Sequence, residues 1–174
     1  MRRCLTGQVA YNFLMTRRLV LPLLAVLLIA GCRSRDVQQD LRITGVHSGW
    51  YDAGIMADGK NKLVPSISIR LENISQEPIS GVQMNAIFHR SNEPAVVWGE
   101  HFIRAIGSDE LVGAATSNPI VLRGTLGYTG TQSRLQMLKN REFIDATVDI
   151  FGKHGSRTWA KMGTFKIDRQ LLTE

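Results

Sequence analysis

The sequence predicts an all-β fold, an immunoglobulin-like antiparallel β-sandwich that contains one short helix. Apolar and polar residues alternate with a period of two in several segments, which is the pattern of strands with one buried face. Turn-forming residues separate these segments at intervals of roughly 8–12 residues, as in β-sandwiches. Strands and helices do not alternate along the chain, so a parallel sheet is not expected.

The chain opens with the features of a secretory signal peptide, to which we assign residues 1–31. Arg17 and Arg18 precede an apolar run that ends at Gly31 and is shorter than the ~20 residues of a transmembrane helix. Met15 begins a compact signal of its own, so translation is expected to start there. A longer leader from Met1 is the alternative and leads to the same destination.

The last residues of the apolar run and the cysteine that follows, Ile29, Ala30, Gly31 and Cys32, resemble the lipobox of bacterial lipoprotein precursors. The resemblance implies cleavage before Cys32, diacylation of its sulfur and acylation of the new amino terminus. Such chains hold a protein stably on a lipid bilayer. Arg33 stands where an aspartate favours inner-membrane retention in enterobacteria-like sorting, which implies the outer membrane, facing the periplasm, in a Gram-negative host. A short buried helix that ends in Gly-Cys is the alternative.

Residues 32–40 are expected to be the lipidated cysteine and a short polar tether, with the β-sandwich domain over 41–174. Four of the 21 basic residues and none of the 15 acidic ones precede Cys32, so removing the signal lowers the net charge from +6 to +2. The remaining basic residues are scattered, which argues against a nucleic-acid partner. Cys4 lies in the signal, so the mature domain has no disulfide and depends on its core.

Three segments give the clearest alternation. They are 66–73, with Ile67, Ile69 and Leu71 facing inward; 82–90, with Val82, Met84, Ala86 and Phe88 inward; and 144–150, with Ile144, Ala146, Val148 and Ile150 inward. The link between the first two is rich in turn formers. We therefore expect these two strands to pair with each other.

The remaining elements are predicted from weaker signals. A strand that begins near Thr158 forms a terminal hairpin with 144–150, and a bulge at Gly163 lets its core face switch. Residues 41–49 and 95–106 are further strands, and Asp58-Gly59 marks a tight turn. The helix is predicted over 131–143, with Gly130 and Thr131 at its start.

The segment 66–98 resembles the central strand, Asn-containing turn and strand of bacterial envelope domains of the FxLYD type. Residues 71–73 stand where that unit has its "V.N" and residues 82–88 where it has its second strand, whereas residues 89–94 replace its Asp-Gly turn. The resemblance implies a non-catalytic scaffold and a paired hairpin, and it says little of function.

The sequence offers no arrangement typical of catalysis, and we expect neither an enzyme nor a cofactor. His47 and Ser48 are neighbours on a predicted strand, so their side chains point to opposite faces. The four histidines lie in separate segments without metal-ligand spacing, so we expect no metal site; Glu100 beside His101 is the nearest approach. The glycines of 124–131 fit a bent loop better than a phosphate site.

Aromatic residues are the remaining candidates for recognition. Trp50 and Tyr51 are adjacent on an extended segment, so at least one is expected at the surface or rim; a ring that caps the open end of the sandwich is the alternative. Trp98 and Trp159 are expected in the core. The leading hypothesis is an envelope lipoprotein that acts as a non-enzymatic accessory or binding module for an envelope protein. The alternative is a cell-wall or glycan-binding lipoprotein that uses Trp50 and Tyr51.

Overall fold

A computed structural model describes residues 36–172, which form one compact unit. The signal peptide, the lipobox and Cys32 lie outside the described residues. The elements are α2 Val37–Asp40, β1 Leu41–Ile55, β2 Asn61–Asn73, β3 Val82–Arg90, β4 Glu93–Ile106, β5 Ile120–Arg123, β6 Tyr128–Gly130, α3 Arg134–Lys139, β7 Ala146–His154, β8 Ala160–Lys166 and β9 Leu171–Leu172.

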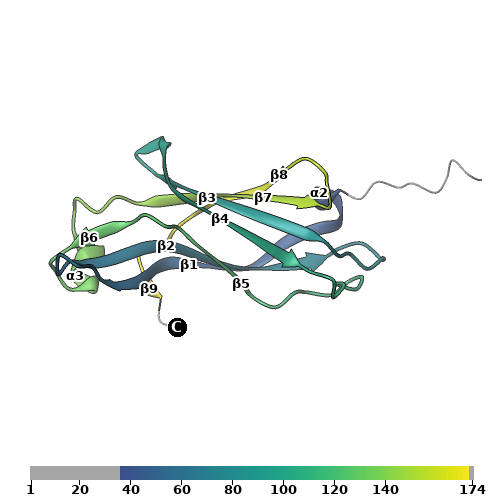
Figure 1. The fold of residues 1–174 in the computed structure, drawn as a ribbon, viewed down its shortest axis with the longest axis horizontal. Helices are drawn as coiled ribbons and strands as arrows, with labels where there is room; N and C mark the ends of the chain where they lie inside the picture. Colours follow the sequence, from purple (N-terminus) through teal and green to yellow (C-terminus); the bar gives the residue numbers. More distant parts are fainter. Residues whose placement is uncertain (1–35, 173–174) are drawn as a thin grey trace, which may run out of the picture. The chain divides into compact units, whose positions relative to one another are not determined.

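The strands form two sheets that pack face to face (Figure 1). One sheet has the order β5-β2-β1-β9, and β6 also pairs with β2; the other has the order β4-β3-β7-β8. All pairs are antiparallel except β1 with β9. The second sheet has the C′-C-F-G order of immunoglobulin-like domains, and β1, β2 and β5 correspond to their strands A, B and E. The predicted all-β sandwich is therefore confirmed.

The core contains the side chains that the alternation placed inward. Buried residues from both sheets form one apolar cluster. The predicted inward residues with no exposed surface are Ile67, Ile69, Leu71, Val82, Met84, Ala86, Phe88, Ala146, Val148 and Ile150. Ile144 is the exception, because it precedes β7 and is half-buried, while the neighbouring Phe143 is 3% exposed.

The predicted pairing between 66–73 and 82–90 is wrong. β2 pairs with β1, β5 and β6, whereas β3 pairs with β4 and β7, so the link between β2 and β3 crosses from one sheet to the other. The hairpin implied by the FxLYD resemblance is wrong for the same reason. Alternation shows which face of a strand is buried, but it does not show which strand lies beside it.

The predicted terminal hairpin is confirmed, as β7 and β8 pair antiparallel. The register shifts between Ile150 and Phe151, which face Gly163 and Lys161, so Met162 is an extra residue in β8. The bulge therefore lies one residue from the predicted position. The turn at Asp58-Gly59 is also confirmed, with Gly59 at a φ of 80°.

The expected tether is shorter than predicted, because residues 36–40 belong to the folded domain. Asp36 caps α2 by accepting a hydrogen bond from the Gln38 N–H at 3.0 Å. Val37 is 3% exposed and belongs to the core cluster. The Gln38 side chain donates to the Lys161 carbonyl of β8 at 2.8 Å. Residues 36–40 therefore belong to the folded domain, whose start was predicted at residue 41.

The helix α3 is also shorter than the predicted 131–143. It begins after Ser133, not Thr131, and the Gln136 side chain accepts hydrogen bonds from both the N–H and the hydroxyl of Ser133. Met137 and Leu138 are buried, whereas Leu135 is 60% exposed. A partial apolar stripe thus supports a helix of only six residues.

Candidate functional site

The adjacent His47 and Ser48 point to opposite faces of β1, as expected. His47 is exposed, whereas Ser48 is 4% exposed. The Ser48 hydroxyl lies 3.1 Å from both the Lys166 carbonyl and the Asp168 carboxylate, and it accepts a hydrogen bond from the Asp168 N–H. No imidazole is among these contacts, so the geometry holds the chain and does not activate a nucleophile.

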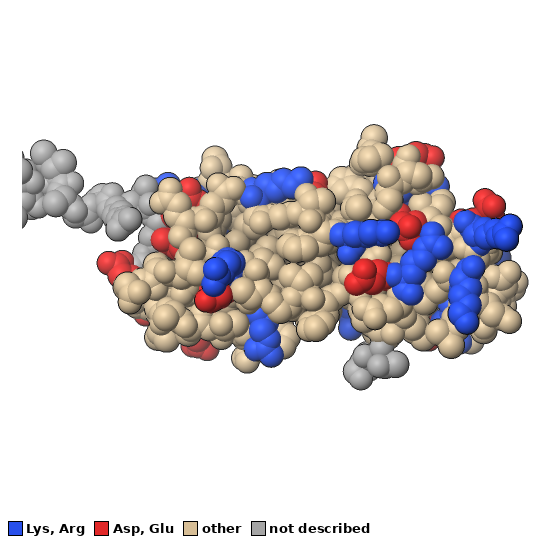
Figure 2. Space-filling model, turned by 180° about the vertical axis from the view of Figure 1, so that it is seen from behind, with Lys and Arg blue, Asp and Glu red and all other residues tan. Residues whose placement is uncertain are grey.

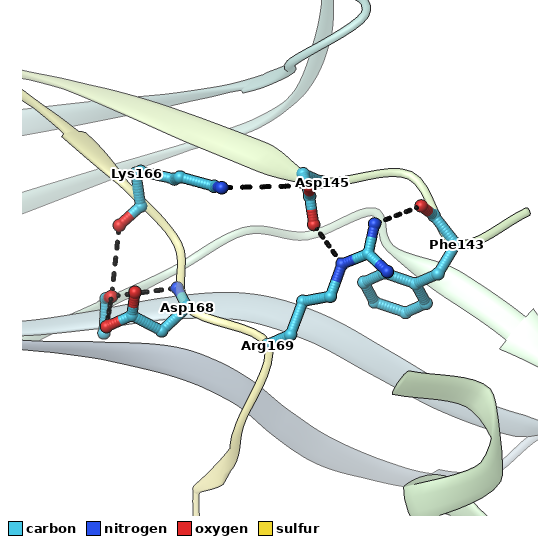
Figure 3. Close-up of polar contacts among 6 residues, drawn as sticks. Phe143, Asp145, Lys166, Asp168 and Arg169 are labelled. Carbon is cyan, nitrogen blue, oxygen red and sulfur yellow. Dashed lines mark hydrogen bonds and ion pairs between the residues drawn. The ribbon is translucent and has the colours of Figure 1, made fainter. Parts of the chain in front are cut away.

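These contacts belong to a polar cluster that fixes the crossing from β8 to β9 (Figure 3). Arg169 donates from Nε to the Asp145 carboxylate at 2.5 Å and from its terminal nitrogen to the Phe143 carbonyl at 3.0 Å. The hydrogen bond that Arg169 donates to the Asp145 carboxylate raises the pKa of Arg169 above its already high value. The cluster therefore joins the second sheet to β1 and β9, which is a structural role.

The histidines do not assemble a metal site within residues 36–172, where no group of three or more potential ligands occurs. Instead, His101 Nδ1 accepts a hydrogen bond from the Arg123 N–H at 3.1 Å. The Leu126 N–H donates to the Trp98 carbonyl at 2.9 Å. These two bonds join β4 to the β5–β6 segment, so His101 connects the edges of the two sheets.

No helix in the described part of the chain is long and apolar enough to cross a membrane.

The expectation of a binding surface at Trp50 is wrong, because this side chain has no exposed surface. Its ring packs edge-to-face against Trp98 and Phe143, with centroid distances of 5.8 and 4.6 Å. Tyr51 points the other way and is half-buried, with the Arg123 guanidinium 3.6 Å from its ring centroid. Trp50 is therefore a core residue, and the Arg123 guanidinium already covers the Tyr51 ring.

A different pair of aromatic rings is exposed on the outer face of the β4-β3-β7-β8 sheet. Phe102 is 59% exposed and Trp159 is 39% exposed, and their rings meet edge-to-face with centroids 5.9 Å apart. The half-buried Phe151 lies on the same face, since Phe102 and Phe151 both pair with Asn85 of β3. We call Phe102, Phe151 and Trp159 the aromatic patch.

Two bulges turn the exposed rings outward. In β4 the register shifts beside Gly99, whose φ of 130° suits glycine, so Trp98 turns inward while Phe102 faces out. In β8 the extra residue Met162 shifts the alternation, so that Trp159 faces out. The prediction that Trp159 lies in the core is therefore wrong, whereas Trp98 is half-buried and packs against the core.

Polar and basic side chains adjoin the aromatic patch. Lys153 places its ammonium 4.8 Å from the centroid of the Trp159 ring. Arg104 and Arg157 each lie two residues from an aromatic ring, and neither they nor Lys153 forms an ion pair within residues 36–172. Asn85 lies between Phe102 and Phe151 on this face, and its Oδ1 is buried without a hydrogen-bond partner.

A second polar group lies further along the same sheet face. Asp149 accepts a hydrogen bond from Thr164 at 2.6 Å and pairs with Lys161 at 2.8 Å, and His89 Nε2 is 3.8 Å away. Burial opposes the charged carboxylate, but the bonds from Lys161 and Thr164 outweigh it and lower the pKa of Asp149. These contacts join β7 to β8, because Asp149 pairs across the ladder with Thr164 and also binds Lys161.

The basic side chains elsewhere are mixed with acids. On the face opposite to that of Figure 1, Lys and Arg gather toward the end that carries β6 and α3, with Asp and Glu among them (Figure 2). The ion pairs Arg134 with Asp52 and Arg169 with Asp145 account for part of this mixture. Such interleaved charge is typical of a solvated surface.

No family model and no curated protein matches this chain. Three solved structures resemble its fold. A Bordetella pertussis structure that carries the name ApaA is 13% identical, with a TM-score of 0.38 over 74% of this chain and 92% of that one. A protein from Archaeoglobus fulgidus is 14% identical, with a TM-score of 0.38 over 71% and 91%. The Northeast Structural Genomics target SoR45 is 10% identical, with a TM-score of 0.37 over 76% and 89%. Likeness at this level carries no argument about function.

Proposed function

We propose that the mature protein is a lipid-anchored lipoprotein of the cell envelope, in which the sandwich acts as a non-enzymatic accessory or binding module. The observation that carries the proposal is the succession of Arg17-Arg18, a short apolar run and the lipobox residues that end at Cys32. The fold supports it, because a folded domain with its own core begins four residues after Cys32. The acyl chains are its contact with the bilayer, and the partner is a second envelope protein.

The proposal includes a location. Arg33 follows the anchoring cysteine, so the protein is expected on the periplasmic side of the outer membrane in a Gram-negative host. The four residue-to-residue steps from Cys32 to Asp36 span at most ~14 Å when extended. The sandwich would therefore stay close to the membrane surface.

The decisive variant is Cys32→Ser in the full precursor. Wild-type protein should sediment with membranes and incorporate labelled palmitate. The variant should lose the label and remain an uncut precursor, because the lipid-dependent cleavage lacks its substrate. A Cys32→Ser protein that is cut at the same bond and stays as firmly membrane-bound as wild type would contradict the proposal. Crosslinking of the anchored protein in cells then identifies its partner.

Glycan binding is the second candidate function, and it now depends on other residues than the sequence suggested. Trp50 is in the core, but Phe102 and Trp159 expose ring surface on the outer face of the β4-β3-β7-β8 sheet. Exposed rings of this kind suit the apolar faces of sugars. The test is sedimentation of the wild-type protein with isolated peptidoglycan. Binding that is lost in Phe102→Ala and Trp159→Ala supports this function, and absence of binding by wild type dismisses it.

A further inference from the structure

We propose that the aromatic patch, together with Arg104, Lys153 and Arg157, is a docking surface for the anionic lipid bilayer that holds the acyl chains. This inference rests on the proposed function, since it takes the anchor at Cys32 as given. It adds that the domain contacts the membrane through one defined face instead of moving freely on its tether.

The anchored segment enters the domain through α2, which contacts β7 and β8. Val37 of α2 is buried and packs against Gly152 of β7. A Cβ added at Gly152 would lie 3.5 Å from the Val37 side chain. Gly152 pairs with Ala160, the residue after Trp159. The Gln38 side chain also bonds to β8, at the Lys161 carbonyl. The anchored segment thus joins the domain at the β7–β8 hairpin that carries Trp159, and the ~14 Å reach from Cys32 to Asp36 keeps that end near the lipid.

The exposed aromatic rings on this face suit a lipid interface. Trp and Phe rings are favoured at the boundary between lipid headgroups and hydrocarbon, where an apolar ring meets water. Phe102 and Trp159 expose 59% and 39% of their surfaces on a folded domain whose other large aromatic rings are more buried. Insertion into the interface would cover this apolar surface, which supplies the driving force for docking.

The docking face also carries basic side chains. Lys153 lies over the Trp159 ring, Arg104 and Arg157 are each two residues along the chain from an exposed ring, and none of the three forms an ion pair within the described residues. Cations near an anionic membrane surface are attracted to it. Lys161 adds less, because Asp149 pairs with it at 2.8 Å.

The same end of the sandwich has an acidic side, which fixes the orientation. Asp109 and Glu110 lie in the connection between β4 and β5 and line a shallow groove that Arg104 also borders. An anionic bilayer would repel these carboxylates and attract the β7–β8 side. Because Arg104 borders the same groove as Asp109 and Glu110, it adds less than Lys153 and Arg157, and the domain docks with the β7–β8 side of the outer sheet face toward the lipid.

The test uses the lipidated mature protein reconstituted into phosphatidylethanolamine and phosphatidylglycerol vesicles that contain brominated acyl chains. Bromine quenches tryptophan emission only at contact range. Trp50 is fully buried and Trp98 is half-buried, so Trp159 should account for the quenching. We expect quenching of the wild-type emission, loss of that quenching in Trp159→Phe, and a weaker effect in vesicles without phosphatidylglycerol.

Two double charge-reversal variants distinguish docking through this face from a general electrostatic attraction of the protein to the vesicle. Lys153→Glu with Arg157→Glu should reduce the quenching to roughly half or less, because two attractive charges become repulsive. Lys139→Glu with Arg141→Glu changes the net charge equally at the far end of the sandwich, where both residues are exposed, and should leave the quenching as in wild type. Near-ultraviolet circular dichroism of each variant checks that the core is intact.

The outcomes distinguish this inference from the proposed function. A wild-type protein that fails to float with the vesicles contradicts the lipid anchor itself. A protein that floats but shows no quenching, or is quenched equally in Trp159→Phe, overturns the docking surface and leaves the anchor standing. Quenching that both charge-reversal pairs reduce equally also overturns it. Shielding of Trp159 by peptidoglycan, with no effect of brominated lipid, would assign the patch to glycan instead.

Discussion

The Asn73 side chain donates a hydrogen bond to the Leu111 carbonyl at 2.9 Å and so joins the two connections at the α2 end of the sandwich. It also donates to the Glu77 carbonyl at 2.8 Å, and its oxygen accepts from the N–H and hydroxyl of Ser75. Asn73 is fully buried. Its amide therefore holds the link that carries the chain from β2 in one sheet to β3 in the other.

Replacement of Asn73 should be costly, and the two replacements differ in their pH dependence. Asn73→Ala should lower the free energy of unfolding by about 3 kcal/mol, because buried groups lose their partners. Asn73→Asp should cost more at neutral pH, since a carboxylate would face two carbonyl oxygens, and its pKa would rise. The cost should then shrink as the pH falls toward about 4. Urea unfolding at both pH values measures this, and an Asp variant that is less stable in acid relative to wild type contradicts it.

Substitutions at Trp50 should reveal a core residue. Trp50→Ala should cost about 3–5 kcal/mol of stability by leaving a cavity. Trp50→Phe should cost far less, because the buried indole N–H has no hydrogen-bond partner and its removal offsets part of the lost packing. Tyr51→Ala should cost about 1 kcal/mol, since it loses a contact with the Arg123 guanidinium. Thermal and urea unfolding rank the three, and a mild Trp50→Ala would contradict the buried position.

Asp149 should make stability depend on acid pH. Its pKa is lowered in the folded protein, so its contribution is present above the unfolded value of about 3.9 and is lost as the pH falls through the folded pKa. Asp149→Asn should therefore be about 1 kcal/mol less stable than wild type at neutral pH and nearly equal to it in strong acid. Glu93→Gln, at an exposed ion pair, should change little at either pH. A constant difference across the range would count against the lowered pKa.

Gly127 should tolerate no side chain, whereas Gly107 should. A Cβ at Gly127 would collide with the Leu63 carbonyl of β2, and backbone cannot move aside as a flexible side chain does. Gly127→Ala should lower the free energy of unfolding by about 1–3 kcal/mol. A Cβ at Gly107 would meet no atom within 4 Å, and Gly107→Ala should stay within roughly 0.5 kcal/mol of wild type. Equal stability of the two variants would show that β6 does not approach β2 so closely.

The sequence could predict which face of a strand is buried but not which strands lie beside it. The alternation of Ile67, Ile69 and Leu71 identified a half-buried strand, because burial depends on period two alone. The pairing of that strand depends on distant segments. The eight residues between β2 and β3 have the turn formers of a hairpin link, but they cross between the sheets and are held by Asn73, which bridges two connections.

The aromatic patch escaped prediction for a related reason. Phe102 and Trp159 lie beyond bulges at Gly99 and Met162, and each bulge reverses the faces that simple alternation assigns. The bulge in β8 was expected, but its consequence for Trp159 was not. Trp50 and Tyr51 were correctly expected to face opposite ways, yet only the structure shows that Trp50 faces the core.

The most direct test of the central claim is mass spectrometry of the tryptic amino terminus of the purified membrane form. The account predicts that the mature chain begins at Cys32 and that the Cys32-Arg33 peptide carries the mass of three acyl chains. An unmodified peptide running from Leu19 to Arg33, with the Gly31-Cys32 bond intact in the membrane-bound protein, would contradict it.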